Sequence, residues 1–311
     1  MTSHGERKGY VALVATIFIW STPSLFQFFL NRYYDPFAQN FYRYSIAFLA
    51  ILPFVIYRAR RDGPRLDGRA LGICFLPALP NVVHQITQVV SLFYMGPGVY
   101  SVFIRSSVII TALLALAFFP EERWIIRQWQ FQVGTFLGLL GAVGVFWFQP
   151  RWEGRQVSLA GLSIAFTASF CWALYGVLAK KPSAQLGSVR SFGIISFLTS
   201  LMLFPLTWLF GKLGTPFEVS AQVNAILIIS AVLCIAIAHV LYYVAIREIG
   251  VALSQSLQLL SPLGAILLSA WLFHERLTMP QLASAGILLF GAFLATRVKP
   301  QAAVITAAEN L

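Results

Sequence analysis

Residues 98–123 read GVYSVFIRSSVIITALLALAFFPEER, and residues 250–276 read GVALSQSLQLLSPLGAILLSAWLFHER. Both segments begin with Gly-Val, continue as a long apolar run and end with Glu-Arg, and the second is one residue longer than the first. The match extends upstream to Trp20 in IFIW, which is repeated 152 positions later as Trp172 in SFCW. The chain therefore contains one unit twice.

The composition of the 311-residue chain excludes a soluble globular protein. Hydrophobic residues make up 58% of it and charged residues 11%, so it carries more apolar surface than a soluble fold of this length can bury. A net charge of +11 would suggest a nucleic-acid partner in a soluble protein, but the basic residues lie in short runs between apolar segments. These runs orient the chain in a membrane, and no nucleic-acid partner is expected.

Ten apolar segments have roughly the 20 residues that a helix needs to cross the hydrocarbon core. They cover residues 9–30, 37–57, 70–94, 98–119, 129–148, 157–179, 190–210, 223–245, 251–273 and 280–297. Because each half holds an odd number of segments, the second half must enter the bilayer in the opposite direction from the first. We therefore predict an all-α membrane protein with ten transmembrane helices as two inverted five-helix repeats.

The repeats are expected at residues 9–148 and 157–297, with a short cytoplasmic tail at 298–311. One set of loops and helix ends carries fifteen Lys and Arg residues, and the opposite set carries six. By the positive-inside rule both termini should be cytoplasmic, in a multi-pass protein of the inner membrane. The first apolar run follows Arg7 and Lys8 like a signal peptide, but it is longer than a usual h-region and is expected to stay as a helix.

Arg105 is the one basic residue that falls well inside an apolar segment. A guanidinium facing lipid there would cost several kcal/mol, so it should face a cavity, a carbonyl cluster or an acidic partner such as Asp35 or Glu275. One hypothesis is that it binds an anionic group of a solute, because its planar fork fits carboxylate or phosphate. The alternative is that it snorkels outward or latches to a carbonyl. Arg43, six residues into the second segment, is expected to anchor the outer end of that helix, with assistance to Arg105 as the alternative.

Two apolar segments carry polar residues at helical spacing. Since residues three and four apart share a helix face, each set should form one stripe. The stripe of the segment 70–94 holds Asn81, His84, Gln85 and Gln88, and that of the segment 251–273 holds Ser254, Gln255, Gln258, Ser261 and Pro262. The candidate solute-binding residues among them are Asn81, His84, Gln85, Gln88, Gln255 and Gln258. The stripes predict a shared central cavity, with hydrogen bonding between helices as the alternative.

All eleven acidic residues fall in termini, loops or helix ends. A proton relay near the middle of the membrane would therefore have to use His84 or His239, and the alternative is that both are neutral and hydrogen-bonded inside the bundle. Trp20, Trp172, Tyr175 and Tyr242 could form aromatic walls for an organic solute, or serve only in packing.

No cofactor or metal site is expected. The cysteines Cys74, Cys171 and Cys234 lie alone inside apolar runs, without a CxxC pair or a neighbouring histidine at metal spacing, as is typical of small buried hydrophobes. Gly134, Gly138 and Gly141 should let another helix approach closely.

The doubled layout and several segments resemble the EamA-type permeases of the drug/metabolite transporter superfamily across residues 9–298. The segments are IWSTPS at 19–24, FYRYSIAFLAILPF at 41–54, LAFFPEERW at 116–124 and SAWLFHERL at 269–277. The resemblance implies two inverted five-helix units around a central cavity and movement of small metabolites, often export, without a bound cofactor. The chain departs from the family in Arg105, where such permeases usually have an uncharged residue.

The leading hypothesis is thus a secondary transporter, with export as the expected direction, for a small organic metabolite such as an amino acid or organic anion. Enzyme signatures such as HExxH, GxSxG and a Walker loop are missing from the sequence, so no enzyme activity is expected. The alternatives are a lipid-translocating protein and a non-transporting receptor on the same fold. The expected partners are a small-molecule solute and the lipid bilayer, and the protein could act as a monomer.

Overall fold

The computed structural model describes residues 4–61, 68–94, 100, 104, 107–148, 159–261, 263–264 and 278–297. Within these ranges every regular element is helical and no strand occurs. The elements are α1 His4–Ile19, α2 Pro23–Leu30, α3 Pro36–Arg61, α4 Gly68–Tyr94, α6 Ser107–Phe118, η2 Pro120–Glu122, α7 Arg123–Arg127, α8 Trp129–Trp147, α9 Leu159–Leu186, α10 Ser188–Phe210, α11 Thr215–Glu218, α12 Ala221–Ser230, η3 Ala231–Ile237, α13 Ala238–Ile249, α14 Val251–Leu257, η4 Gln258–Leu260 and α16 Met279–Thr296.

Each of the ten predicted segments contains at least one of these helices, but the ten predicted crossings are not confirmed. Six stretches are long and apolar enough to span a membrane: Gly5–Leu30, Pro36–Arg61, Gly68–Tyr94, Leu159–Leu186, Ser188–Phe210 and Ala221–Ile249. The shorter apolar helices are Ser107–Phe118, Val251–Leu260 and Met279–Ala295. Part of the fourth and ninth predicted segments, and the whole predicted tail 298–311, lie outside the described residues.

Two predicted segments differ from the observed helices, in both cases near a proline, although the first remains one candidate span, Gly5–Leu30. The first apolar segment breaks at Trp20–Thr22, because Pro23 occupies the first turn of α2, where a missing N–H costs nothing. The predicted segment 157–179 ends too early, since α9 continues through Pro182 to Leu186. That helix stops instead at Gly187, whose φ of 77° favours glycine.

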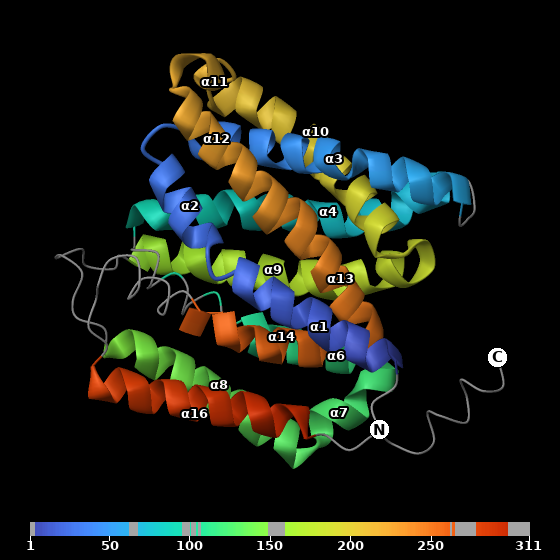
Figure 1. Ribbon diagram of the computed structural model, residues 1–311, viewed down its shortest axis with the longest axis vertical. Helices are drawn as coiled ribbons and strands as arrows, with labels where there is room; N and C mark the ends of the chain where they lie inside the picture. The colour runs from blue at the N-terminus through green and yellow to red at the C-terminus, as the bar shows by residue number, and fades with distance from the viewer. Residues whose placement is uncertain are drawn as a thin grey trace.

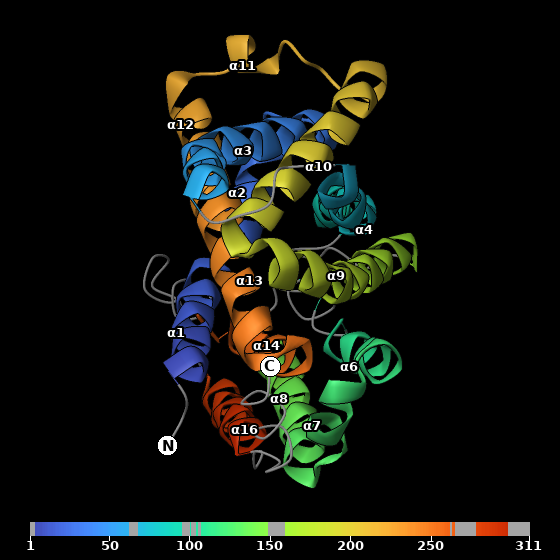
Figure 2. The same ribbon diagram turned by 90° about the vertical axis from the view of Figure 1, so that its right-hand side faces the viewer.

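The helix pairs that pack together recur when the two halves are exchanged. The repeat makes α13 the counterpart of α4 and α9 the counterpart of α1, and α4 packs on α9 as α13 packs on α1. Three further helices each pack on their own counterpart: α3 on α10, α6 on α14 and α8 on α16. Figures 1 and 2 show α8 and α16 lying together at one side of the bundle, beyond α1, α6 and α14. The sequence repeat is therefore also a repeat of packing.

Glycines bring α8 and α16 into close contact, as the sequence predicts. A Cβ added to Gly141 would lie 2.5 Å from the backbone nitrogen of Leu288, and one added to Gly134 would lie 2.5 Å from that of Ala295. A Cβ on Gly291 would meet the backbone of Gly138. Small residues that let helix backbones approach this closely are typical of membrane proteins.

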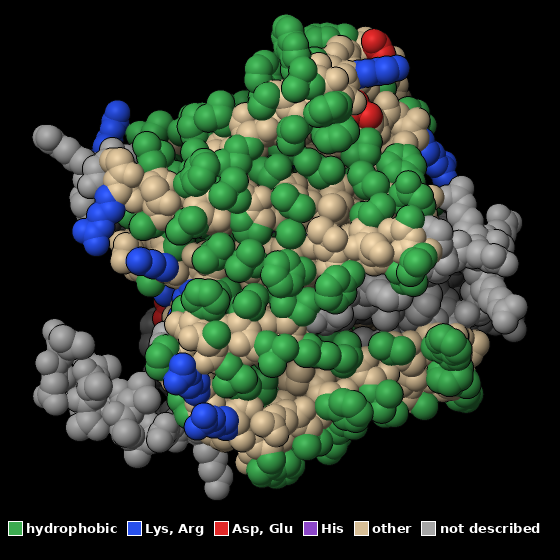
Figure 3. Space-filling model, turned by 180° about the vertical axis from the view of Figure 1, so that it is seen from behind, with side chains coloured by type: hydrophobic (Ala, Val, Ile, Leu, Met, Phe, Trp, Pro, Cys, Tyr) green, Lys and Arg blue, Asp and Glu red, His purple; other side chains and the backbone are tan. Residues whose placement is uncertain are grey.

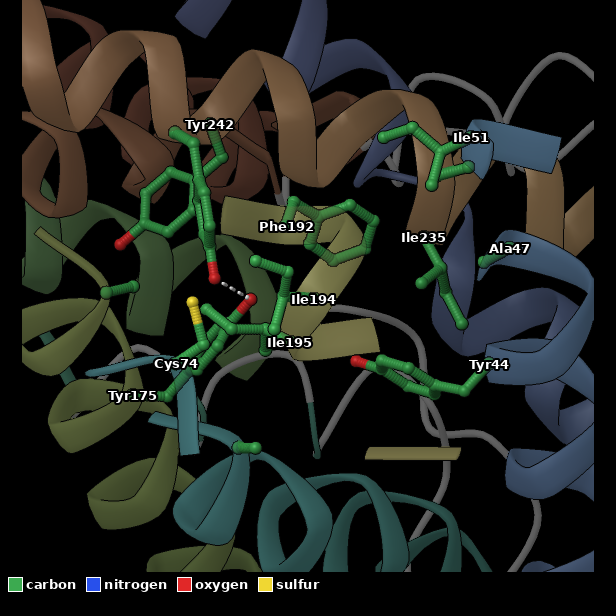
Figure 4. Close-up of a cluster of buried hydrophobic side chains, with 14 of the residues drawn as sticks. Tyr44, Ala47, Ile51, Cys74, Tyr175, Phe192, Ile194, Ile195, Ile235 and Tyr242 are labelled. Carbon is green, nitrogen blue, oxygen red and sulfur yellow. Dashed lines mark hydrogen bonds between the residues drawn. The ribbon is translucent and has the colours of Figure 1, made fainter. Parts of the chain in front are cut away.

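The outer surface is apolar, and the interior mixes aromatic and polar groups. In Figure 3 hydrophobic side chains cover the middle of the molecule, and most Lys and Arg side chains gather at one end. The main core joins α3, α4, α9, α10, η3 and α13. Figure 4 shows Tyr175, Phe192 and Tyr242 of this core, from three different helices. The core fixes the positions of the helices that line the cavity described next.

Candidate functional site: a central cavity between the two halves

A cavity with about 740 Å³ of empty space, part of it open to solvent, lies between the two halves. Seven of the predicted site residues line it: Trp20, His84, Gln85, Gln88, Trp172, His239 and Gln258. The other lining residues are Ser21, Pro23, Ser24, Gln27, Arg43, Tyr100, Ile104, Cys234, Ile235 and Ser261. Both repeats contribute to the walls.

An aromatic cluster forms one wall of the cavity. Trp20 and Trp172 meet edge to face with ring centroids 5.1 Å apart, and Tyr242 stacks on Trp172 at 5.7 Å. The indole Nε1 of Trp20 donates a hydrogen bond to the carbonyl of Cys234 at 2.9 Å. Because the indole is held by this bond, the wall has a fixed geometry.

The π-helical segment η3 holds two of the lining residues in place. Its Ile235 carbonyl lies 3.0 Å from Nδ1 of His239, and its Cys234 carbonyl accepts the Trp20 bond. π-Helical turns are rare and frequently occur at functional sites. Here the turn connects α12 with α13 and carries Cys234 and Ile235 into the cavity wall.

Both histidines line the cavity, and each places its Nδ1 against a backbone carbonyl. A carbonyl only accepts hydrogen bonds, so Nδ1 of His84, at 2.9 Å from the Ala168 carbonyl, must carry a proton, and the same holds for His239. In the neutral ring, Nε2 is then an acceptor. Nε2 of His239 is buried and has no partner in the described part of the protein, so it is available to a donor inside the cavity.

Arg43 is the main correction to the predicted site. It does not anchor an outer helix end; its side chain is 1% exposed and lines the cavity. Its Nε donates to Ser230 Oγ at 3.1 Å, while its Nη1 is buried without a partner among the described residues. Its burial depends on the packing of η3 and α12 against α3, which the spacing of the sequence alone does not reveal.

Four predicted site residues lie behind the lining instead of in it. Asn81 accepts a hydrogen bond from Tyr44 Oη and donates one to Thr199 Oγ1, both at 3.1 Å. These bonds match the alternative of hydrogen bonding between helices.

The other three belong to two buried pairs. Gln255 Nε2 donates to Tyr242 Oη at 2.8 Å, and Tyr175 Oη accepts from Tyr243 Oη at 2.8 Å, the bond dashed in Figure 4. Tyr242 thus joins the aromatic wall from behind.

Arg105 lies outside the described residues. One of its two predicted partners, Asp35, has another role: its carboxylate accepts the backbone N–H groups of Phe37 and Ala38 at the start of α3, and that of Lys212. The other, Glu275, is also outside the described residues.

Sequence analysis missed Gln27 on α2, whereas Ser261, just beyond η4, belongs to the polar stripe predicted for the segment 251–273. Gln27 and Ser261 line the cavity and are each 1% exposed, and Gln27 Oε1 and Ser261 Oγ have no partner in the described chain. The sequence feature that could have identified Gln27 is its polar amide within an otherwise apolar segment. Among the described residues no group of three or more His, Cys, Asp or Glu could hold a metal ion.

A second polar cluster joins the halves beyond the cavity. The buried carboxylate of Glu122 accepts the backbone N–H groups of Val251 and Ala252, both at 3.0 Å, and pairs with Lys180 Nζ at 2.5 Å. Gly250 precedes them with a φ of 86°, and an added Cβ would lie 3.1 Å from Glu122 Oε1. This contact explains the glycine of the second Gly-Val pair.

The Glu122 cluster and the cavity occupy different levels of the bundle. Lys180 lies eight residues beyond Trp172 on α9, about 12 Å at 1.5 Å per residue. Arg43 and Gln27 lie on the opposite side of the tryptophan pair, near the start of α3 and the end of α2. The described cavity therefore extends from the tryptophans toward the end where α2 leads into α3, and the Glu122 cluster lies beyond its other end.

Comparison with known proteins gives a consistent result. The sequence model of the EamA-like transporter family matches residues 7–147 and 159–297. An uncharacterized transporter of Archaeoglobus fulgidus is 25% identical over 94% of this chain and 97% of its own length. One of Clostridium kluyveri is 22% identical over 93% of each chain. A solved crystal structure with 17% identity superposes with a TM-score of 0.74 over 94% of this chain and 98% of its own, which shows the same fold.

Proposed function

The chain belongs to the EamA-like transporter family, and on this premise we propose that it is a secondary transporter for a small organic metabolite such as an amino acid or organic anion. The solute binds in the central cavity and crosses the membrane by alternating access. The observation that carries the proposal is a cavity between the repeats that is walled by aromatic rings and lined by buried polar atoms of Gln27, Arg43, His239 and Ser261 that have no partner among the described residues. Such atoms are costly to bury unless a ligand or water satisfies them.

The lining residues divide into two roles. Trp20 and Trp172 contact the apolar body of the solute, while His84, Gln85, Gln88, His239 and Gln258 hydrogen-bond its polar groups. Asn81, Tyr175, Tyr242 and Gln255 hold these side chains in place from behind, as their hydrogen bonds support. Arg105 remains a predicted contact.

Alternating access requires two gates and two halves that move against each other. We assign the halves to residues 9–148 and 157–297, as two inverted five-helix repeats with ten crossings. The exchange of packing pairs between the halves supports this assignment. In the described conformation the Glu122 cluster forms the closed gate, and opening requires Glu122 to leave the backbone of α14.

The charge distribution supports an orientation. Most Lys and Arg side chains visible in Figure 3 lie at the end that holds the start of α1, so this end and both termini are assigned to the cytoplasm of the inner membrane. The described cavity then faces outward, and the Glu122 gate faces the cytoplasm. In export, this conformation is the one that releases the solute.

Counterflow into proteoliposomes tests the proposal. The purified protein, loaded with an unlabelled mixture of amino acids and organic acids, should accumulate at least one labelled member of the mixture with saturation. Trp172→Ala should reduce that uptake, and Trp147→Ala, whose side chain lies on the outer surface with 76% exposure, should not. Absence of saturable counterflow for every member of the panel contradicts the proposal.

A further inference from the structure

The buried guanidinium of Arg43 lacks a counter-charge in the described protein. Its side chain is 1% exposed and lies inside the bundle, with Nη1 unpartnered and Nε bonded only to the neutral hydroxyl of Ser230. The ionisable groups that face it are Tyr44, Cys234 and His239. None of these carries a negative charge at neutral pH.

The cavity itself carries no described carboxylate. Of the described residues that line it, Arg43 alone has a permanent charge, and none is Asp or Glu. A buried charge is unfavourable unless it is paired. An anion inside the cavity would therefore be stabilised by Arg43, whereas a cation would be repelled.

We infer that Arg43 binds the carboxylate of the solute, and that the transported class is small organic monocarboxylates with an apolar body. This inference rests on the proposed function, because it assigns a solute class to the same cavity. The planar fork of Arg43 accommodates a carboxylate in two parallel hydrogen bonds. The apolar body of the solute rests against Trp20 and Trp172, whose rings form the wall beside it.

The same charge count separates monocarboxylates from zwitterions. A monocarboxylate neutralises Arg43, while a zwitterion leaves the cavity with its original positive charge and brings an ammonium group that no described carboxylate would receive. A neutral amide of the same shape can accept a hydrogen bond from the guanidinium but does not neutralise its charge, and a protonated amine is repelled by it. We therefore expect selection by charge more than by the shape of the apolar body.

Matched solute pairs in a binding assay test the inference. The probes are phenylacetate, its neutral isostere phenylacetamide, and phenylalanine as a zwitterion, added to the purified full-length protein while its thermal unfolding is recorded. Ligand binding to the folded state raises the unfolding temperature. In the wild type, phenylacetate should bind about tenfold or more tighter than phenylacetamide, the worth of a charge-assisted hydrogen bond.

Three variants assign this preference to Arg43. Arg43→Gln should abolish the preference for phenylacetate over phenylacetamide. Arg43→Lys should still prefer phenylacetate over phenylacetamide, but by a smaller factor, because an ammonium lacks the planar fork. Ser230→Ala removes the hydrogen bond to Nε but keeps the charge, so it should keep the preference and show that the effect does not come from loosened packing. If Arg43→Gln does not fold, the test is whether the preference for phenylacetate over phenylacetamide is smaller in Arg43→Lys than in the wild type.

Several outcomes overturn the inference. One is a folded Arg43→Gln that still prefers the carboxylate. Another is an Arg43→Lys protein with an undiminished preference. A third is a wild type that is stabilised by chloride alone as much as by phenylacetate, which would make the partner of Arg43 a halide. If the wild type shows no charge preference yet supports saturable counterflow of other solutes, the inference falls while the proposed transport function stands.

Discussion

Trp20 and Trp172, which occupy equivalent positions in the two repeats, contact each other edge to face with ring centroids 5.1 Å apart and planes at 76°. Two equivalent residues of a repeat can touch only close to the pseudo-two-fold axis that relates the two halves. The contact therefore places both tryptophans at the centre of the bundle, beside the cavity that both halves line.

The tryptophan contact predicts coupling between two substitutions. Trp20→Leu and Trp172→Leu should each weaken solute binding, and the double variant should lose less than the sum of the two. Edge-to-face pairs contribute about 0.5–1.5 kcal/mol beyond the burial of their area. A double-mutant cycle on the solute dissociation constant measures this term. Strictly additive losses would show that the two rings act independently.

The Glu122 cluster predicts a gate at the closed end. Glu122→Gln removes the charge that pairs with Lys180 and weakens the bonds to the backbone of α14. Loss of one partner of a buried ion pair costs about 3 kcal/mol, so this end should open more often. The reporter is Ala252→Cys, a buried position on α14, whose labelling by a water-soluble maleimide should become faster.

The same end of the bundle offers a control for the gate. Arg247 and Glu248 form an ion pair there that is partly exposed to solvent, and such pairs contribute little. Glu248→Gln should leave the labelling rate of Ala252→Cys unchanged. If Ala252→Cys is labelled at the same rate with and without Glu122→Gln, then Glu122 does not hold the gate.

Two glycines of the same helix predict opposite effects on stability. Gly291→Ala places a Cβ against the backbone of Gly138, and overpacking of this kind costs about 1–3 kcal/mol. Gly286→Ala meets no atom within 4 Å, and the higher helix propensity of alanine should stabilise α16 by up to about 1 kcal/mol. Unfolding temperatures in the same detergent compare the two, and a Gly291→Ala protein as stable as Gly286→Ala would contradict the close packing.

Much of the fold could be predicted from the sequence because the lipid environment demands long apolar helices. The predicted segment 37–57 appears as Pro36–Arg61, and 129–148 appears as Trp129–Trp147. The helix α3 extends past its apolar run to Arg61, since polar residues at a helix end continue the backbone hydrogen bonds into water. The first segment was predicted as one helix because hydropathy does not register the turn before Pro23.

The site was predicted less completely, because spacing shows only which residues share a helix face. The stripe of the third segment brought His84, Gln85 and Gln88 to the cavity but placed Asn81 behind it. The role of Arg43 depends on how η3 packs against α3, a contact between residues far apart in the chain. Its position near the predicted outer end of a helix suggested an anchor, which was wrong.

Blocking the cavity with a covalent label tests most directly whether it is the transport site. Ser24→Cys would place a thiol in the cavity wall, and Lys212→Cys would place one on an exposed loop at the same end of the bundle. Because the native Cys234 also lines the cavity, both variants are made in a protein whose three native cysteines are replaced by alanine. After reaction with a bulky maleimide, counterflow should be lost in Ser24→Cys and retained in Lys212→Cys, and excess solute should slow labelling of Ser24→Cys alone. Full counterflow through the labelled Ser24→Cys protein would contradict a transport path through this cavity.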